Sequence, residues 1–336
     1  MNKFWLAKLA SCLPSLFFAT LIFASTSSRA QNNSSTALPP INISDNNITV
    51  SGLSSGAFFA VQMAVAHSEK ITGVASFAGG IYGCAKGDPQ RAQGPCMKTL
   101  EQVDVADSIE MTDSSAHDGS IDDPTNLART KVLLFHGTKD GVVNPLSSAK
   151  LEEYFSHYGA TVKDVFDVAS GHGFPSLTAT VPCGEARIPY VNDCGVDGPE
   201  LVFKALYETV KDRGVAKANR LFEFNQQPYT RSGDQMGSAG HVYIPEPCET
   251  KSCRLHIAFH GCLQTPMFVQ KAFVAGAGFN EWAESNEVVI LYPSIQGGAG
   301  NPYSCWDWFG YTNQKYLTTE GVQLQAVMKM VEQLAE

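Results

Sequence analysis

A short β-branched run breaks into Gly-x-Ser-x-Gly and then into an apolar helical stretch, and few folds accommodate this succession. Residues 48–50 predict a buried strand, Gly52–Gly56 a sharp turn and Ala57–His67 a helix. A serine on such a strand-to-helix turn has its Oγ pushed out at the end of the sheet, and the flanking glycines permit the strained backbone. Because a strand precedes the pentapeptide and a helix follows it, Ser54 is a candidate nucleophile.

The chain that follows alternates between strands and helices. Continuous apolar runs predict buried strands at Ile71–Gly80 and Lys131–Gly137, and Leu146–Tyr158 predicts a helix before a further strand at Val162–Val168. Strands that are apolar on both faces are typical of a parallel sheet covered by helices. Between these elements, Val103–Asn126 is polar, acidic and poorly periodic, which indicates a long surface excursion of undefined shape.

The partners that a serine nucleophile needs lie beyond the carboxyl ends of two of these strands. Asp140 follows the strand at Lys131–Gly137, and His172 follows the next strand. Taken singly, either could be an ordinary loop residue. Their position and the order Ser54, Asp140, His172 resemble the catalytic triad of the α/β-hydrolases, in which the base arrives last.

Only residues 31–47 would precede the nucleophile strand in the mature chain, so the strands that usually come before it must lie elsewhere. Moving the C-terminal block to the front restores the usual order, which predicts a circularly permuted α/β-hydrolase with a mostly parallel sheet flanked by helices. The alternative is two independent domains that meet near Asn219–Arg231. The downstream strands are expected at His241–Ile244, Leu255–Phe259 and Val288–Pro293, and the helices at Phe268–Ser285 and Gly321–Glu336.

Residues Met1–Ala30 have the layout of a cleaved secretion signal. Two lysines precede the apolar run Leu13–Ala24, and a small-x-small site ends at Ala30. A membrane anchor is the alternative, but the run is shorter than the roughly 20 apolar residues that span a bilayer. We therefore predict a secreted protein, extracellular or periplasmic, in which residues 31–336 form a single catalytic domain without a membrane span.

The charge of the chain argues against polyanionic partners. The signal segment holds three basic and no acidic side chains, so its removal changes the formal charge from −9 to −12. Nucleic acid and anionic membranes are disfavoured as partners of so acidic a chain. The histidines show no metal-ligand spacing, so we expect neither a metal nor another cofactor, and a monomer is the default expectation.

Eight cysteines remain after the signal segment, and an even number in an exported chain indicates disulfides. Eight cysteines allow 105 pairings. The first six fall into three close pairs separated by loop-like residues, so local bridges are the economical hypothesis, and the last two are left for each other. The expected bridges are Cys84–Cys96, Cys183–Cys194, Cys248–Cys253 and Cys262–Cys305.

Five motifs together carry a family resemblance that covers nearly the whole mature chain, including all eight cysteines. They are Val50–Gly56, Phe77–Gly80, Leu255–Gln264, Ile290–Pro293 and Cys305–Trp308. The chain resembles the secreted single-domain poly(3-hydroxybutyrate) depolymerases, particularly the fungal type with a circularly permuted α/β-hydrolase fold. Two segments depart from the family pattern, 293–305 and Val103–Asn126, and both are candidates for lining the substrate crevice.

The resemblance implies roles for individual residues. Ser54, Asp140 and His172 take the triad positions, and the backbone N–H groups of Ser55 and Cys262 take the oxyanion-hole positions. Trp308 corresponds to a tryptophan of the family's substrate crevice. A bridge from Cys262 to Cys305 would also draw Trp306 toward the site, so both tryptophans are candidate substrate contacts, although either could be a core residue.

Three functions are consistent with this sequence. The first is an extracellular depolymerase that cleaves short-chain polyesters through an acyl-enzyme, with no separate polymer-binding module. The second is a secreted carboxylesterase for small or plant-derived esters on the same fold. The third, a non-catalytic surface-binding protein, is disfavoured because the triad and both oxyanion positions are all present.

Overall fold

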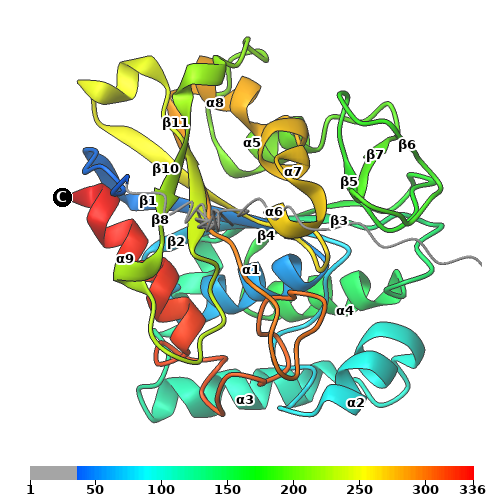
Figure 1. The fold of residues 1–336 in the computed structure, drawn as a ribbon. Coiled ribbons are helices and arrows are strands. Elements are labelled where there is room, and N and C mark those ends of the chain that lie inside the picture. The colour runs from blue at the N-terminus through cyan, green and yellow to red at the C-terminus, as the bar shows by residue number, and fades with distance from the viewer. Residues whose placement is uncertain (1–35) are drawn as a thin grey trace, which may run out of the picture. The chain divides into compact units, whose positions relative to one another are not determined.

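A computed structural model describes residues 36–336 of the chain, and the predicted secretion signal lies outside the described residues. The described residues belong to one compact unit, whose main feature is an eight-stranded sheet in the order β4-β3-β2-β1-β10-β11-β9-β8 (Figure 1). Its strands are β1 (Ile43–Leu53), β2 (Ile71–Phe77), β3 (Lys131–Phe135), β4 (Thr161–Val165), β8 (Leu221–Asn225), β9 (Ala239–Tyr243), β10 (Cys253–Phe259) and β11 (Val288–Tyr292).

The nucleophile strand β1 lies in the middle of this sheet, between one strand from each half of the chain. Ser51 of β1 pairs in parallel with Ala75 of β2 on one side and with Ala258 of β10 on the other. All pairings from β4 to β11 are parallel, and β9 and β8 add an antiparallel edge. The permuted strand order is therefore confirmed, and the alternative of two independent domains is wrong.

Helices cover both faces of the sheet (Figure 1). The α-helices are α1 (Ser55–Ala66), α2 (Pro89–Arg91), α3 (Val105–His117), α4 (Leu146–His157), α5 (Gly198–Leu206), α6 (Pro266–Val269), α7 (Ala272–Gly276), α8 (Phe279–Asn286) and α9 (Val322–Ala335). Shorter elements are the π-helix η1 (Ala92–Thr99), the 3₁₀-helices η2 (Pro124–Arg129), η3 (Ala218–Arg220), η4 (Gln227–Tyr229) and η5 (Glu246–Glu249), and a small sheet of β5 (Phe174–Pro175), β6 (Val181–Pro182) and β7 (Val191–Asp193).

The single helix expected at Phe268–Ser285 is wrong, because the structure divides this stretch among α6, α7 and α8. Gln270 interrupts it with a φ of 52°, and Gly278 does so again with a φ of 96°. Both values lie in the left-handed region, which ends a right-handed helix. The apolar spacing that suggested one helix is instead divided among short helices, of which α7 and α8 contribute Phe273, Phe279 and Trp282 to the core against the sheet.

The segment Val103–Asn126, expected as an excursion without defined shape, contains the helix α3. Asp104 caps its N-terminus, because the carboxylate accepts a hydrogen bond from the Ala106 N–H at 3.0 Å. Its buried side lies against α4, where the Thr112 and Tyr154 hydroxyls are 2.7 Å apart. The segment is thus a solvent-facing helix docked by one narrow face, which explains its weak periodicity.

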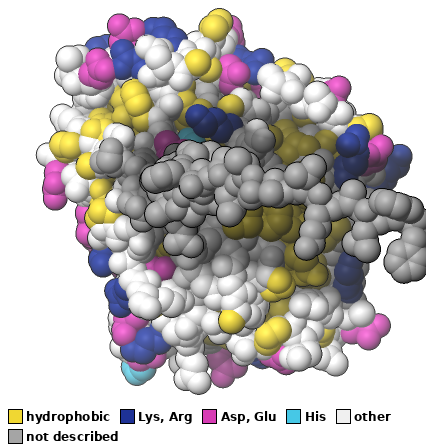
Figure 2. Space-filling model, viewed as in Figure 1, with side chains coloured by type: hydrophobic (Ala, Val, Ile, Leu, Met, Phe, Trp, Pro, Cys, Tyr) yellow, Lys and Arg dark blue, Asp and Glu magenta, His cyan; other side chains and the backbone are white. Residues whose placement is uncertain are grey.

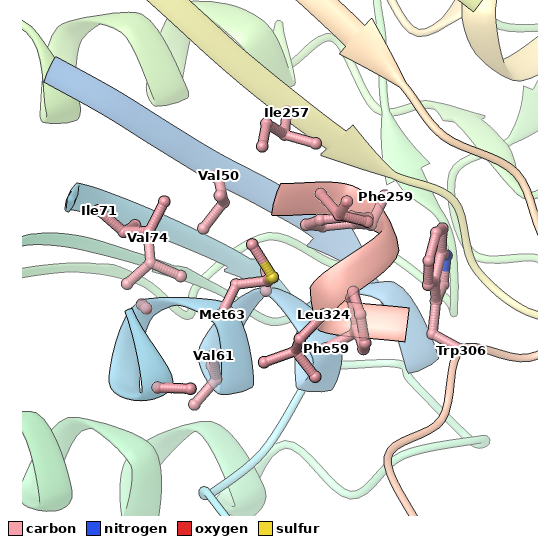
Figure 3. Close-up of a cluster of buried hydrophobic side chains, with 14 of the residues drawn as sticks. Val50, Phe59, Val61, Met63, Ile71, Val74, Ile257, Phe259, Trp306 and Leu324 are labelled. Carbon is pink, nitrogen blue, oxygen red and sulfur yellow. The ribbon is translucent and has the colours of Figure 1, made fainter. Parts of the chain in front are cut away.

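One hydrophobic layer surrounds α1, the helix that follows the nucleophile turn. Every residue of α1 is buried, because β1 and β10 cover one side and the C-terminal part of the chain covers the other. Figure 3 shows Phe59 of α1 between Phe259 of β10, Leu324 of α9 and Trp306. A helix enclosed in this way holds the serine turn at its N-terminus in a rigid position.

A buried polar network also joins β1 to β10 behind the serine turn. The His256 ring lies 2.7 Å from the Thr49 hydroxyl through Nδ1 and 2.7 Å from the Ser51 hydroxyl through Nε2. Burial lowers the pKa of His256 to about 3, so the ring is neutral at pH 7. His256 therefore has a structural role.

Candidate active site

Ser54 occupies the turn between β1 and α1 in a strained backbone conformation. Its φ of 55° and ψ of −120° are costly for a residue with a side chain. The surroundings impose this conformation, because the Ser54 N–H donates to the Phe77 carbonyl at 2.9 Å and the Ser54 carbonyl accepts from the Ala57 N–H at 2.9 Å. Such strain at a serine is typical of a nucleophile turn.

The two glycines of the pentapeptide are required by contact, which gives the sequence motif a physical reason. A Cβ on Gly52 would lie 2.2 Å from the Gly56 carbonyl oxygen, and a Cβ on Gly56 would lie 2.4 Å from the His260 carbonyl oxygen. Neither approach leaves room for a side chain. The close contact of Gly56 with the end of β10 also brings the loop after β10 against the serine turn.

Asp140 and His172 meet at the carboxyl edge of the sheet. The His172 Nδ1 atom lies 2.7 Å from Asp140 Oδ2, and both side chains are almost fully buried. The other carboxylate oxygen accepts hydrogen bonds from the Val142 and Val143 N–H groups at 2.8 and 3.0 Å. Asp140 is thereby fixed with one oxygen toward the histidine ring, which leaves His172 Nε2 as the ring nitrogen that can act as a base.

A second histidine, which no sequence motif singled out, contacts the same carboxylate. His136 Nε2 lies 3.3 Å from Asp140 Oδ2 and 3.1 Å from the Val143 carbonyl oxygen, while its Nδ1 is 2.7 Å from the Ser148 hydroxyl. Burial alone would raise the pKa of Asp140, but the hydrogen bonds from His136 and His172 hold it well below its usual range. The separation of four residues between His136 and Asp140 was the only available sequence signal.

Ser54 and His172 line one cavity of about 520 Å³. Within residues 36–336, the Ser54 hydroxyl has no hydrogen-bond partner, so it is available to a molecule that enters. Hydrogen bonds of this kind are often formed only once substrate is bound. The cavity is mainly apolar, and its remaining walls come from η1, the loop after β3, the loop after β10 and residues 300–309.

The loop after β10 presents a second backbone donor to this cavity. The Gly261 N–H donates to Gln264 Oε1 at 2.6 Å and the Leu263 N–H to the Tyr303 carbonyl at 2.8 Å, which holds the loop on both sides of Cys262. In the described part of the chain, the N–H groups of Ser55 and Cys262 have no acceptor. Two such groups at one cavity wall can stabilise an oxyanion.

All four expected disulfides are present, which confirms the pairing inferred from cysteine spacing. Three of them close short loops. The fourth joins Cys262 to Cys305 across 43 residues and so ties the loop after β10 to the cavity wall at residues 300–309. Residues 300–305 of that wall belong to one of the two segments expected to line the crevice, whereas Val103–Asn126 does not line it.

The two candidate tryptophans have different environments. Trp308 lines the cavity and stacks on Phe58 with ring centroids 4.2 Å apart. Trp306 is fully buried against Phe59 and Phe259 (Figure 3) and does not line the cavity. The expectation of a substrate contact at Trp306 is therefore wrong, because the chain turns between the two residues and only Trp308 faces the cavity.

The loop that presents Trp308 is organised by a buried carboxylate that no sequence motif singled out. Asp307 accepts hydrogen bonds from the N–H groups of Gly310 at 2.7 Å, Tyr311 at 3.0 Å and Thr312 at 3.0 Å. Burial raises the pKa of Asp307 despite these donors. These hydrogen bonds hold residues 307–312 in a tight turn, and the turn fixes the segment that carries Trp308 into the cavity wall.

Figure 2 shows acidic and basic side chains interspersed over the uncovered part of one face. Among residues 36–336, no set of three or more histidine, cysteine, aspartate or glutamate side chains is placed to hold a metal ion. Nor does this part of the chain contain a helix long and apolar enough to cross a membrane.

The chain is similar in sequence to known depolymerases. No protein-family model matches it. It is 35% identical over 307 residues to a poly(3-hydroxybutyrate) depolymerase of Delftia acidovorans, of which it spans 61%, and 30% identical over 318 residues to a polyhydroxybutyrate depolymerase of Talaromyces funiculosus, of which it spans 92%. Each alignment covers 89% of this chain.

Solved structures give the same result. A crystal structure of PHB depolymerase from Penicillium funiculosum has a TM-score of 0.83 to this chain at 29% identity, covering 89% of this chain and 99% of the other. A PHB depolymerase complexed with an R3HB trimer matches with the same scores. The similarity therefore extends over nearly the whole described fold.

Proposed function

The chain belongs to the poly(3-hydroxybutyrate) depolymerase family, and we propose that it is a secreted serine hydrolase that cleaves the ester bonds of short-chain hydroxyalkanoate polyesters. One observation carries the proposal. A strained Ser54 and a His172 held by Asp140 line the same apolar cavity, beside two backbone N–H groups that have no acceptor among residues 36–336.

The proposed reaction uses these groups in sequence. His172 Nε2 takes the proton of Ser54 as its Oγ attacks the ester carbonyl, and the same proton then goes to the departing alkoxide. Asp140 keeps the ring in the required tautomer and stabilises the imidazolium. Water, deprotonated by His172, next attacks the acyl-enzyme, and His172 returns the proton to Ser54 Oγ as the acyl–oxygen bond breaks and the acid is released.

The charge that develops on the carbonyl oxygen would be bound by the Ser55 and Cys262 N–H groups. Loss of one such donor typically costs about 3–4 kcal/mol of transition-state stabilisation. The Cys262–Cys305 disulfide supports this role through the backbone, because it holds the Cys262 loop while the sulfur itself takes no part. His260, next to this loop, is buried, and burial lowers its pKa to about 4, which disfavours it as the base.

Substrate binding is assigned to the apolar walls, with Trp308 and the exposed Tyr303 on one side. We propose that residues 31–336 act as one catalytic domain and that adsorption to a solid polyester uses the surface of this domain itself. A monomer suffices for the proposed site, because all of its groups come from one chain. Export is supported by the four disulfides, which persist in oxidising compartments.

The experiment that tests the function compares two substrates with the purified mature protein. We expect release of soluble acid from a poly(3-hydroxybutyrate) film and hydrolysis of p-nitrophenyl butyrate. Hydrolysis of the soluble ester without attack on the film would favour the small-ester alternative. Inactivity on both, with an intact fold by circular dichroism, would favour a non-catalytic protein.

Trp308→Ala should impair polymer degradation more than hydrolysis of a short soluble ester. The indole lines the cavity, and an aromatic packed against a substrate is worth on the order of 1–3 kcal/mol, of which a short ester uses less. We expect a loss of roughly tenfold or more on the film and a smaller loss on p-nitrophenyl butyrate, measured with equal amounts of folded protein.

A matched control for this variant is Phe222→Ala, which removes a partly exposed aromatic that does not line the cavity. It should leave both rates close to those of the wild type. Equal losses on film and soluble ester in Trp308→Ala would mean that the indole supports the structure of the site and does not hold the polymer.

A further inference from the structure

The cavity wall includes one permanently charged side chain. Among the described residues that line the cavity, Lys98 is the only lysine, arginine, aspartate or glutamate. Lys98 is exposed, and in the described part of the chain no carboxylate lies within 4 Å of its Nζ atom. A lone cation at an apolar site, in a chain with a formal charge of −9, indicates a local role in binding an anion.

The structure holds Lys98 in place. Its Nζ donates to the Gly141 carbonyl at 2.8 Å, and its own carbonyl accepts from Asn144 Nδ2 at 2.8 Å. The π-helix η1 that carries it is also joined to the preceding loop by the Cys84–Cys96 disulfide. With one proton donated to Gly141, two further N–H groups of the ammonium remain for a ligand.

A second donor lies one turn away on the same helix. Gln93 also lines the cavity, and it precedes Lys98 by five residues. In a π-helix, residues five apart are joined by the backbone hydrogen-bond pattern and share one side. An amide N–H₂ and an ammonium group at this spacing form a pair of donors suited to the two oxygens of a carboxylate.

The position of Lys98 also indicates which end of a substrate it meets. Gly141, which accepts its hydrogen bond, follows Asp140, and Asp140 holds His172. In the proposed mechanism His172 protonates the departing alkoxide, so the leaving group occupies this side of Ser54. When a polyester of hydroxy acids is cleaved, the leaving fragment is the one that ends in the free carboxyl group.

We propose that Gln93 and Lys98 form a subsite for the terminal carboxylate of short, soluble hydroxy-acid oligomers. The inference rests on the proposed function and adds a substrate class to it: the cavity accepts the anionic fragments that polymer cleavage releases, and it binds them with the carboxylate end on the leaving-group side. An ester bond near the acid end is then placed at Ser54, and its hydrolysis releases the terminal hydroxy acid.

A binding experiment tests this subsite independently of turnover. The Ser54→Ala protein would be titrated calorimetrically with a linear 3-hydroxybutyrate trimer as the free acid and as its methyl ester. We expect tighter binding of the acid, and an increase of about three- to fivefold in its Kd when Lys98→Gln is added, the range of an exposed ion pair. The Kd of the methyl ester should be unchanged.

Two controls separate a charge effect from a structural one. Lys139→Gln, in the same Ser54→Ala background, removes an exposed lysine beside Asp140 that does not line the cavity, and it should leave both Kd values unchanged. In about 1 M salt, where the Debye length is about 3 Å, the preference for the acid should disappear in the protein that retains Lys98.

Equal binding of acid and methyl ester at low salt would overturn the proposal, as would an equal increase in both Kd values in Lys98→Gln. Either result would leave the proposed hydrolase function in place if the wild type still cleaves the methyl ester. Failure of the wild type to cleave any ester, with the acid preference intact in Ser54→Ala, would instead overturn the proposed function alone and leave an anion-binding cavity.

Discussion

Replacement of Ser54 by alanine is expected to lower ester hydrolysis by roughly four to six orders of magnitude while the protein remains folded. The change removes only the hydroxyl group. Within the described residues this hydroxyl makes no hydrogen bond, so its loss does not destabilise the turn. Alanine and serine both carry a Cβ, so the free-energy cost of holding this residue at a φ of 55° does not change. Turnover of p-nitrophenyl butyrate and a thermal melt measure the two quantities.

Ser76→Ala is the matched control for this variant. Ser76 lies near the end of the adjacent strand β2, is fully buried and does not line the cavity, and its hydroxyl has no partner in the described structure. Its removal should leave the rate near that of the wild type. A Ser54→Ala protein that retains near-normal turnover and an unchanged melting temperature would exclude Ser54 as the nucleophile.

Asp140→Asn should lower kcat by roughly three to four orders of magnitude. An asparagine N–H₂ group facing His172 Nδ1 would donate to it and would favour the tautomer with the proton on Nε2, which cannot then accept a proton from Ser54. The bonds from the Val142 and Val143 N–H groups to the other oxygen can remain, so the loop is retained. The comparison of kcat at matched substrate saturation measures the effect.

The structure makes this change more severe than a loss of charge alone. His136 Nε2 also faces the affected oxygen, at 3.3 Å, so an amide there would place an N–H₂ group between the nitrogens of two histidine rings. Asp164→Asn, on the exposed face of β4, removes the same charge away from the cavity and should have little effect. Similar activity in the two variants would mean that Asp140 does not orient His172.

The catalytic candidates could be predicted from sequence because their positions depend on local backbone constraints. Gly52 and Gly56 have no room for a Cβ, so the motif around Ser54 is imposed by contact and is visible in the residues themselves. Asp140 follows a strand whose continuous apolar character was plain, whereas His172 comes after the mixed and partly exposed strand β4. Both are parallel strands, whose carboxyl ends share one edge of the sheet. The three local disulfides could also be predicted, because only a few residues separate the two cysteines of each pair.

Other features depended on contacts between segments far apart in the chain, which no local pattern encodes. Trp306 and Trp308 are two residues apart, yet packing of α1 and β10 buries the first and leaves the second at the cavity. The distance of His136 from Asp140 and the approach of Lys98 to Gly141 depend on how the loop after β3 packs. By itself, the sequence determined the strands of the large sheet apart from the edge strand β8, the serine turn and the order of the triad, because backbone sterics and hydrophobic burial act along the chain. The tertiary structure alone decided which side chains face the cavity, because that depends on packing across the sheet.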